Sequence, residues 1–258
     1  MNNILAVAGI VIKELYRRKD AYVLLILTAL ICFVMASVNI FNDDKIVRYL
    51  KEICLVLIWV CSLVIAITTT ARQIPMEREN RTLFPLLAKP LTRTQLLVGK
   101  FVGCWVACGL TLLCFYTFFG VLAASREHHW PLVNYIQDAG LHWVMLGVVV
   151  AFTLLGSLIF AAPSSNATIT FVLATFILVL GRHLNQVAVH LTEPRRSILY
   201  SLDYAMPHLE FFDVRDLIIH DWPPIAWKVC GLATLYALAY TGVFLIAACL
   251  VFRRKALN

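Results

Sequence analysis

Long apolar runs that contain almost no charged residues dominate this sequence. Only 14% of the residues are charged and 61% are hydrophobic, whereas a soluble domain has about a quarter charged and about half apolar residues. In hydrocarbon every backbone polar group has to pair within the protein, so only helices and closed barrels span a membrane. Unbroken apolar runs, with no alternating ten-residue segments, favour helices. The sequence therefore predicts an all-α membrane protein.

A transmembrane helix needs about 20 apolar residues, and six runs of the chain meet this requirement. We predict one membrane-spanning helix in each of them, at 21–41, 53–71, 101–123, 141–162, 167–184 and 225–252. The stretch 3–19 is too short to span and ends in a basic cluster, which is typical of a helix lying on the cytoplasmic surface. Residues 1–258 are expected to form a single transmembrane domain.

The distribution of basic residues predicts that both termini are cytoplasmic. With the N-terminus inside, the inner segments carry 13 Lys and Arg against 4 Asp and Glu, and the rest of the chain carries 9 and 11. These inner segments are 1–20, 72–100, 163–166 and 253–258. Because cytoplasmic loops carry the excess of Lys and Arg, the formal charge of +7 is a topology signal, and no nucleic-acid partner is expected.

An outer polar segment, 182–224, is too long to be a simple connector. Pro194 lies where a first helical turn tolerates proline, and Pro207 interrupts the segment. We predict two short helices, near 194–205 and 210–220. The second would have one apolar face, formed by Phe211, Val214 and Ile218. This pattern fits a re-entrant hairpin that dips into the membrane, and an ordinary surface loop is the alternative.

A search for catalytic motifs returns none. HExxH, GxSxG and GxxxxGK[ST] are all absent, so zinc proteolysis, serine hydrolysis and P-loop nucleotide binding lack their usual residues. The predicted spans are nearly free of Asp, Glu, Lys and Arg away from their ends, whereas ion-coupled carriers keep ionisable groups at membrane depth. An external motor is the simplest energy source, and we expect no catalytic, cofactor or metal site in this chain.

Histidine and cysteine give only weak signals of metal binding. The histidines titrate near neutrality, but no metal-type spacing organises them, which favours interfacial or solvated positions over a metal site. They fall in or beside the predicted outer segments, at His128, His129, His142, His183, His190, His208 and His220. The eight cysteines lie in apolar runs and behave as small hydrophobes. Cys104 and Cys108 are one helical turn apart, so a shared soft metal is the alternative to simple packing there.

The cytoplasmic segment 72–98 is the most informative polar stretch. Thr82 is positioned to cap a short helix whose first turn accommodates Pro85. That helix would have an apolar face of Leu83, Leu86 and Leu87, which needs something to cover it. Thr92 and Gln95 then form a capping-box pattern at the start of the third span. A short, stiff helix between two membrane helices is suited to contact with a soluble partner, and a solvated loop is the alternative.

Small residues recur at helical spacing in the third span, at Gly99, Gly103 and Ala107. Such a stripe lets two helices approach closely. Packing within one chain and packing between two protomers both fit the pattern.

Three stretches resemble ABC-2 type permeases, the membrane subunits of bacterial ABC exporters. The stretch from Glu77 to Lys100 reads ERENRTLFPLLAKPLTRTQLLVGK and is similar to the coupling-helix region of that family. The stretches Tyr204 to Asp213 and Leu235 to Lys255 are similar to the subgroup that includes permeases linked to copper-enzyme maturation. The resemblance covers essentially the whole chain.

The resemblance implies a type V exporter fold in the bacterial cytoplasmic (inner) membrane. Two six-helix permeases would assemble with two ATPase subunits, which bind the ATP and Mg that this chain is not expected to hold. It also implies that the segment between spans two and three docks on the ATPase, and it leaves room for accessory proteins on the outer side. The contact and hinge candidates are Glu77, Glu79, Arg81, Thr82, Leu86, Lys89, Pro90 and Arg93, with Glu14 and Arg17 nearby.

Together these features predict the permease of an ATP-driven exporter, a mechanical rather than a chemical role. The alternative hypothesis is a non-transporting membrane anchor that recruits a cytoplasmic complex through the same segment. An intramembrane enzyme is disfavoured because candidate residues are lacking. The transported substrate does not follow from the sequence, since members of the family carry lipids, polysaccharides, peptides, drugs and ions.

Overall fold

The computed structural model describes residues 2–17, 22–23, 26, 28–31, 33, 44–79, 92–127, 131–189, 192–193 and 195–254. All regular structure in those residues is helical. The helices are α1 (Asn2–Arg17), α3 (Asp44–Ala71), α4 (Pro75–Glu79), α6 (Arg93–Glu127), α7 (Leu132–Ile159), α8 (Pro163–Val189), α9 (Arg195–Ala205), the 3₁₀ helix η1 (Leu209–Phe212), α10 (Asp216–Ile219) and α11 (Trp227–Arg254).

Four helical stretches within the described ranges are long and apolar enough to cross a membrane. They are Lys51–Glu79, Arg93–Ala124, Leu132–Ile159 and Trp227–Arg254, and a shorter apolar helix covers Pro163–Val179. The second, third, fourth and sixth predicted runs are thus confirmed as long apolar helices, and the fifth as a shorter one. Most of the first run, 21–41, lies outside the described residues.

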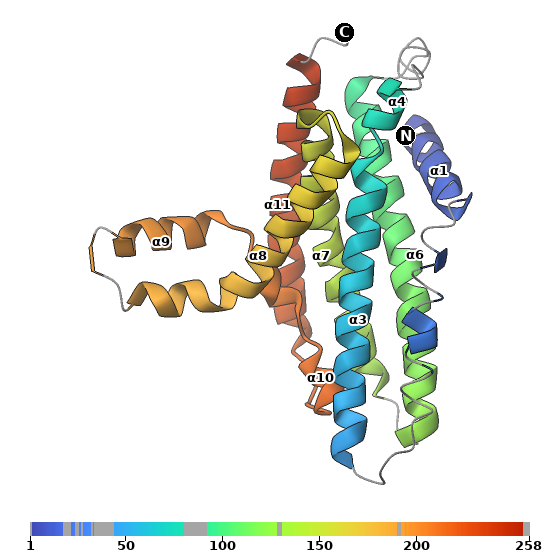
Figure 1. Ribbon diagram of the computed structural model, residues 1–258, viewed down its shortest axis with the longest axis vertical. Coiled ribbons are helices and arrows are strands. Elements are labelled where there is room, and N and C mark those ends of the chain that lie inside the picture. Colours follow the sequence, from blue (N-terminus) through green and yellow to red (C-terminus); the bar gives the residue numbers. More distant parts are fainter. Residues whose placement is uncertain are drawn as a thin grey trace.

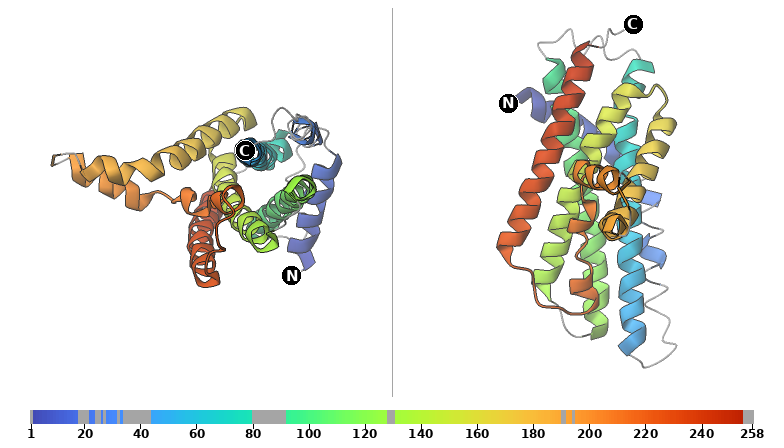
Figure 2. Two further views of the ribbon diagram at one scale, coloured as in Figure 1. Left: turned by 90° about the horizontal axis from the view of Figure 1, so that it is seen from below. Right: turned by 90° about the vertical axis from the view of Figure 1, so that its left-hand side faces the viewer.

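The long helices α3, α6, α7 and α11 run side by side as a bundle (Figure 1). Both termini and α4 lie at one end, and α10 lies toward the other. The distal part of α8 and α9 form a hairpin that projects from the side of the bundle, which the two further views confirm (Figure 2). The short helix α1 lies obliquely across α6 near the end that carries the termini.

Proline marks several helix boundaries. Pro75 and Pro163 are the first residues of α4 and α8, and Pro131 caps the start of α7. Proline is favoured at the first helical position because its missing N–H has no intrahelical acceptor there and its φ suits the helix. The bundle therefore turns where the sequence places proline next to an apolar run.

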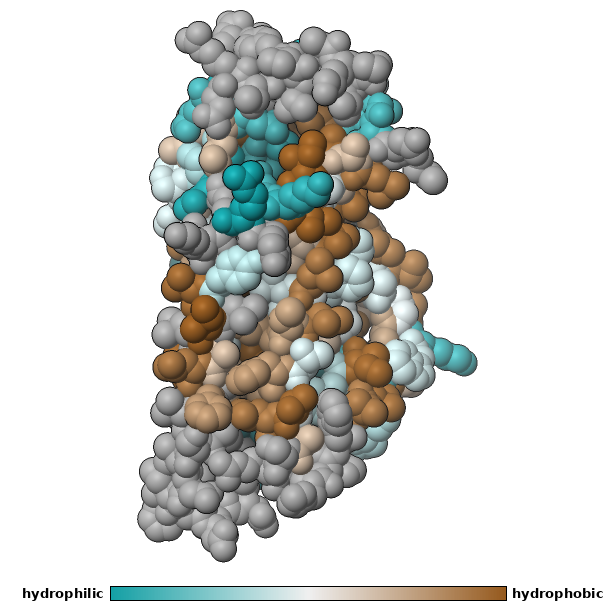
Figure 3. Space-filling view, turned by 90° about the vertical axis from the view of Figure 1, so that its right-hand side faces the viewer, coloured by the Kyte–Doolittle hydropathy of each residue, from teal (hydrophilic) through white to brown (hydrophobic). Residues whose placement is uncertain are grey.

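The surface of the bundle is apolar where lipid would contact it. Exposed side chains on the α1 and α6 face include Leu5, Ile10, Leu110, Leu113 and Val121. On that face apolar side chains predominate in the middle, and hydrophilic ones gather toward the end with the termini (Figure 3). Exposed apolar area on this scale is typical of a membrane-embedded protein.

A reciprocal pair of tryptophans joins α6 to α7. Trp105 Nε1 donates to the Trp143 carbonyl oxygen at 2.9 Å, and Trp143 Nε1 donates to the Trp105 carbonyl oxygen at 3.0 Å. The two rings stack with centroids 4.7 Å apart. Each ring lies against a glycine of the facing helix, Gly147 under Trp105 and Gly109 under Trp143. The same pattern, Trp-Val-x-x-Gly, occurs in both helices. Each helix therefore supplies one indole ring and one glycine on which the ring of the other helix packs.

The outer segment is only partly as predicted. Helix α9 matches the stretch predicted near 194–205. The prediction of a second helix at 210–220 is wrong, because the chain forms η1 and the four-residue α10 with three non-helical residues, 213–215, between them. Consequently Phe211, Val214 and Ile218 share no face: Phe211 is 57% exposed and Ile218 is fully buried.

Polar side chains of α3 and α7 hold this irregular segment. Asn134 Nδ2 donates to the carbonyl oxygens of Leu217 and Trp222, both at 3.0 Å. Gln137 exchanges two hydrogen bonds with the backbone of Ile225, at 2.7 and 3.0 Å. These amides supply partners that a helix would otherwise provide within its own backbone. The helical pattern gives way here because tertiary contacts satisfy the backbone instead.

The tryptophan pair predicts a specific sensitivity at Gly109. In Gly109→Ala the new methyl group overlaps the Trp143 indole, and overpacking of this kind costs about 1–3 kcal/mol. We expect the thermal midpoint of the purified protein in detergent to fall by about 2 °C or more.

The matched control is Gly231→Ala in α11, where a Cβ meets nothing within 4 Å. Its midpoint should stay the same or rise slightly, since alanine favours helix over glycine. Equal midpoints for the two variants would contradict the proposed role of the pair.

Candidate functional site

The predicted capping box at the start of the third span is confirmed. Thr92 N donates to Gln95 Oε1 at 3.1 Å, and Gln95 N donates to Thr92 Oγ1 at 3.2 Å. These reciprocal bonds satisfy two of the backbone donors that a helix start leaves free, so α6 begins at Arg93. The predicted helix around Thr82 and Pro85 lies outside the described residues, as do these contact candidates: Arg81, Thr82, Leu86, Lys89 and Pro90.

A buried ion pair fastens the beginning of segment 72–98, the predicted coupling segment, to the bundle. Lys100 Nζ of α6 lies 2.7 Å from Glu77 Oε1 of α4, and their side chains are 4% and 19% exposed. Lys100 also donates to Gln73 Oε1 at 3.0 Å. An ammonium group at this depth requires such partners, because burying an unpaired charge is costly. Glu77 is therefore engaged within the chain, while Glu79, two residues on, is exposed.

The other end of the coupling segment is fastened to α11. Arg93 donates to the carbonyl oxygens of Phe252 at 3.0 Å and Arg253 at 3.4 Å. Its guanidinium also lies 5.7 Å from the centre of the Phe252 ring. A cation at the last carbonyls of a helix satisfies acceptors that lack intrahelical donors and complements the helix dipole. Thus 80–91 connects two points that are fixed to different membrane helices.

Helix α1 packs on the small-residue stripe of α6 within the same chain. A Cβ on Gly99 would lie 2.7 Å from Val7 Cβ, and one on Gly103 would lie 2.7 Å from Val11 Cβ and 2.9 Å from the Ala8 carbonyl oxygen. Close approach of two helices needs glycine at such positions. Of the remaining candidates, Ala107 is buried in α6, Glu14 is half-buried and Arg17 is exposed at the end of α1.

A buried polar network occupies the centre of the bundle. The Tyr116 hydroxyl donates to Asp138 Oδ2 at 3.0 Å and lies 3.3 Å from His142 Nδ1. Ser62 Oγ lies 2.9 Å from His142 Nε2. Asp138 and His142 are fully buried, and Asp138 Oδ1 has no hydrogen-bond partner among the described residues. The network joins α3, α6 and α7.

The network continues toward the outer segment through stacked groups. The His142 ring stacks on Trp59 with centroids 4.5 Å apart, and the Arg215 guanidinium lies 5.2 Å from the centre of the Trp59 ring. Asp213 binds Arg215 with two hydrogen bonds, at 2.7 and 2.9 Å. Burial lowers the pKa of Arg215, but the bonds and charge of Asp213 outweigh it and raise that pKa, so the guanidinium stays charged.

Two predictions about ionisable groups need correction. The sequence places Asp138 before the fourth predicted span, 141–162, and predicts an interfacial or solvated position for His142, but α7 begins at Leu132 and buries both side chains. The interior is therefore not free of ionisable groups, and His142 is a core residue rather than an interfacial one. Hydropathy does not predict the burial of Asp138, because the apolar run starts only after this residue. The available signal is the spacing of Asn134, Gln137, Asp138 and His142, which places them on one helix face.

Cysteine contributes packing in this region. Cys104 and Cys108 are both buried in α6. Within the part of the chain that the structure describes, no group of three or more His, Cys, Asp or Glu side chains is arranged to hold a metal ion.

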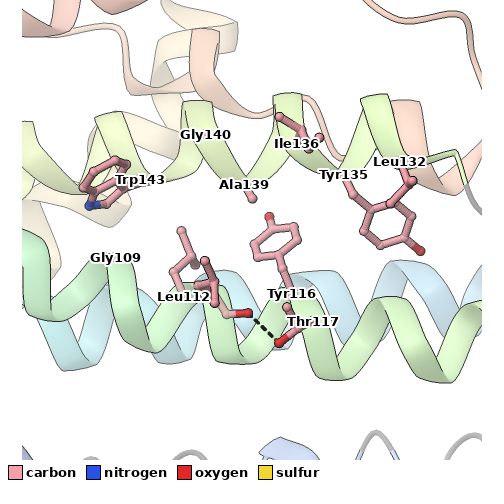
Figure 4. A pocket seen from close by; sticks show the side chains of 11 residues that line it. Gly109, Leu112, Tyr116, Thr117, Leu132, Tyr135, Ile136, Ala139, Gly140 and Trp143 are labelled. Carbon is pink, nitrogen blue, oxygen red and sulfur yellow. Dashed lines mark hydrogen bonds between the residues drawn. The ribbon is translucent and has the colours of Figure 1, made fainter.

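A groove of about 360 Å³ opens between α6 and α7 beside the network (Figure 4). Its walls are nearly all apolar and include Leu112, Leu132 and Ile136, with Gly109 and Gly140 leaving room. The tryptophan pair lies beside it through Trp143. No charged side chain lines this groove, so it offers no ionic partner to a charged ligand.

The fold and these sites define a multi-pass helical membrane protein. Lys100 and Arg93 fasten the two flanks of segment 80–91 to the bundle. Residues 28–257 match the family model of the ABC-2 family transporter protein, so the chain belongs to that family and is the permease component of an ABC transporter. Members of this family are membrane components without catalytic sites and generally pair with an ABC ATPase subunit. No curated protein matches the chain.

The Glu77–Lys100 ion pair predicts non-additive effects of mutation. Glu77→Gln or Lys100→Met alone leaves one buried charged partner uncompensated, which costs about 3–5 kcal/mol. We expect each single variant to lower the free energy of unfolding in detergent strongly, and the double variant to lose less than the sum, with a coupling of about 1 kcal/mol or more. Glu79→Gln, at an exposed position, is the control and should be neutral. Additive losses would contradict the pairing.

The buried network predicts that the Tyr116 hydroxyl stabilises the fold. Tyr116→Phe removes the donor to Asp138 Oδ2 and leaves that buried carboxylate further unsatisfied, which costs about 1–3 kcal/mol. Thermal unfolding of purified variants measures the effect, with Tyr49→Phe as control because Tyr49 is 64% exposed. Similar midpoints for the two variants would show that the network contributes little.

Proposed function

We propose that this chain is the permease of an ATP-driven exporter and works as one of two copies in the bacterial cytoplasmic membrane. Each copy has six spans with both termini in the cytoplasm, and the outer segment forms a re-entrant hairpin. Two ATPase subunits, which bind Mg and ATP, dock on segment 72–98. Membership of the ABC-2 family carries the proposal, and the charge asymmetry of the sequence supports the orientation.

The two anchors of the coupling segment support a mechanical role. At one end Glu77 is bound to Lys100 of α6, and at the other Arg93 is bound to the last carbonyls of α11. Because both flanks are fastened, a docked ATPase that displaces this segment moves α3, α6 and α11 with it. Packed helices transmit such displacements as rigid elements.

ATP supplies the energy through the difference in its affinity for the two arrangements of the complex. A ligand shifts a conformational equilibrium only to the extent that it binds one state better than the other. Closure of the ATPase pair on ATP tilts the coupling segment of each permease, and the path between the two copies changes from inward to outward access. Release of the hydrolysis products restores the first state.

A charge reversal within segment 72–98 tests this function. The double variant Glu79→Arg and Arg81→Glu should lose ATPase subunits on purification in mild detergent, or retain them with hydrolysis uncoupled from transport, because both contact charges are inverted. Glu193→Arg is the matched control, since Glu193 is an exposed carboxylate remote from the coupling end. Unchanged assembly and transport in the double variant would refute docking at this segment. A retained partner without ATPase activity would favour a membrane anchor.

A further inference from the structure

A second groove, between α3 and α8, differs from the apolar one in having a charged side. It also measures about 360 Å³, which lies within the range of small-molecule sites. The apolar wall includes Leu63 of α3 and Phe171 and Leu178 of α8, and the opposite side is formed by Glu210, Asp213 and Arg215.

The charges on that side do not cancel. Asp213 and Arg215 are joined by two hydrogen bonds, so their opposite charges offset each other. Glu210 Oε1 binds His208 Nδ1 at 2.8 Å. Among the described residues, Glu210 forms no ion pair with a Lys or Arg side chain, and His208 is the group that its carboxylate contacts.

The free oxygen of Glu210 is the decisive observation. The side chain is only 8% exposed, and its Oε2 is buried without a hydrogen-bond partner in the described part of the chain. The carboxylate lies directly against Gly181 of α8, where a Cβ would displace it. A buried carboxylate oxygen without a donor is costly, and such an atom beside a groove indicates a partner supplied from outside.

We propose that the α3–α8 groove binds an amphipathic organic cation, whose charged group meets Glu210 Oε2 and whose apolar part lies against α3 and α8. A cation is selected because the charged side carries two carboxylates, Glu210 and Asp213, against one guanidinium, Arg215. An apolar body is selected because the remaining wall is mostly apolar and, apart from the Thr175 hydroxyl, offers no side-chain oxygen to replace water around a small inorganic cation. Phe171 adds an aromatic face that favours cationic groups.

The bound cation would lie beside Trp59, which also lines the groove. Trp59 stacks on His142 and lies under Arg215. A cation bound in the groove would therefore contact a side chain that packs directly on the buried network. Binding of the cation to this chain does not depend on the proposed function. Only a role of the cation as the cargo of the permease rests on that function.

Equilibrium binding of two ions of equal shape and opposite charge tests the site. The full chain is placed in nanodiscs of zwitterionic lipid, and binding of tetraphenylphosphonium and of tetraphenylborate is measured against empty nanodiscs. The proposal predicts saturable binding of the cation at one per chain and no saturable binding of the anion. Saturable binding of both ions with equal affinity would show an apolar groove without charge recognition and overturn the proposal.

Two variants locate the charge. Glu210→Gln keeps the shape and removes the charge, and should weaken cation binding roughly tenfold or more. Gly181→Ala displaces the carboxylate and should weaken it as well. Glu193→Gln removes the same charge from an exposed position and should bind as the wild type does; a similar loss there, or none in Glu210→Gln, would refute the site. Because no ATPase is present, failure here leaves ATPase coupling untouched, and failure of coupling leaves this binding untouched.

Discussion

The fold depends on the constraint that polar groups inside a lipid-embedded bundle must find their partners in the protein. Lipid offers no donors or acceptors, so each buried charge organises the helices around it. Lys100 binds both Glu77 and Gln73 at the end of the bundle that carries the termini. At the opposite end, Lys51 is buried and donates to the Ile218 carbonyl oxygen at 3.2 Å, with Asp221 3.6 Å away.

Polar contacts and apolar packing contribute to this bundle in different ways. Apolar side chains fill the bundle but have no direction, and many small apolar contacts are exchangeable. The tryptophan pair of α6 and α7 and the network around Asp138 fix the register between helices, because hydrogen bonds require particular partners. The described bundle therefore has fixed points at both of its ends and at its centre.

The sequence predicts those parts of the structure that local signals determine. The apolar runs give α3, α6, α7 and α11, and the Thr92 and Gln95 pattern gives the start of α6, since both depend on residues near in sequence. The second outer helix fails because its backbone is satisfied by Asn134 and Gln137 from α7, more than 80 residues away.

The sites show the same limit. The resemblance predicts a docking role for segment 72–98, but the engagement of Glu77 with Lys100 depends on how α4 folds back on α6. The burial of Asp138 was missed because hydropathy averages over a window, and one carboxylate at the edge of an apolar run reads as a loop residue. Glu210 gave no local signal, since its position against Gly181 depends on the path of the outer segment.

The account requires that an ATPase drives this permease, and purification of the tagged chain from native membranes tests that most directly. Mild detergent extraction, identification of the co-purified subunits and an ATP hydrolysis assay form one measurement. The account predicts a partner that carries a P-loop, in equal amount to the chain, and hydrolysis by the purified complex. Recovery of the chain alone, or with a partner that hydrolyses no ATP, would contradict it.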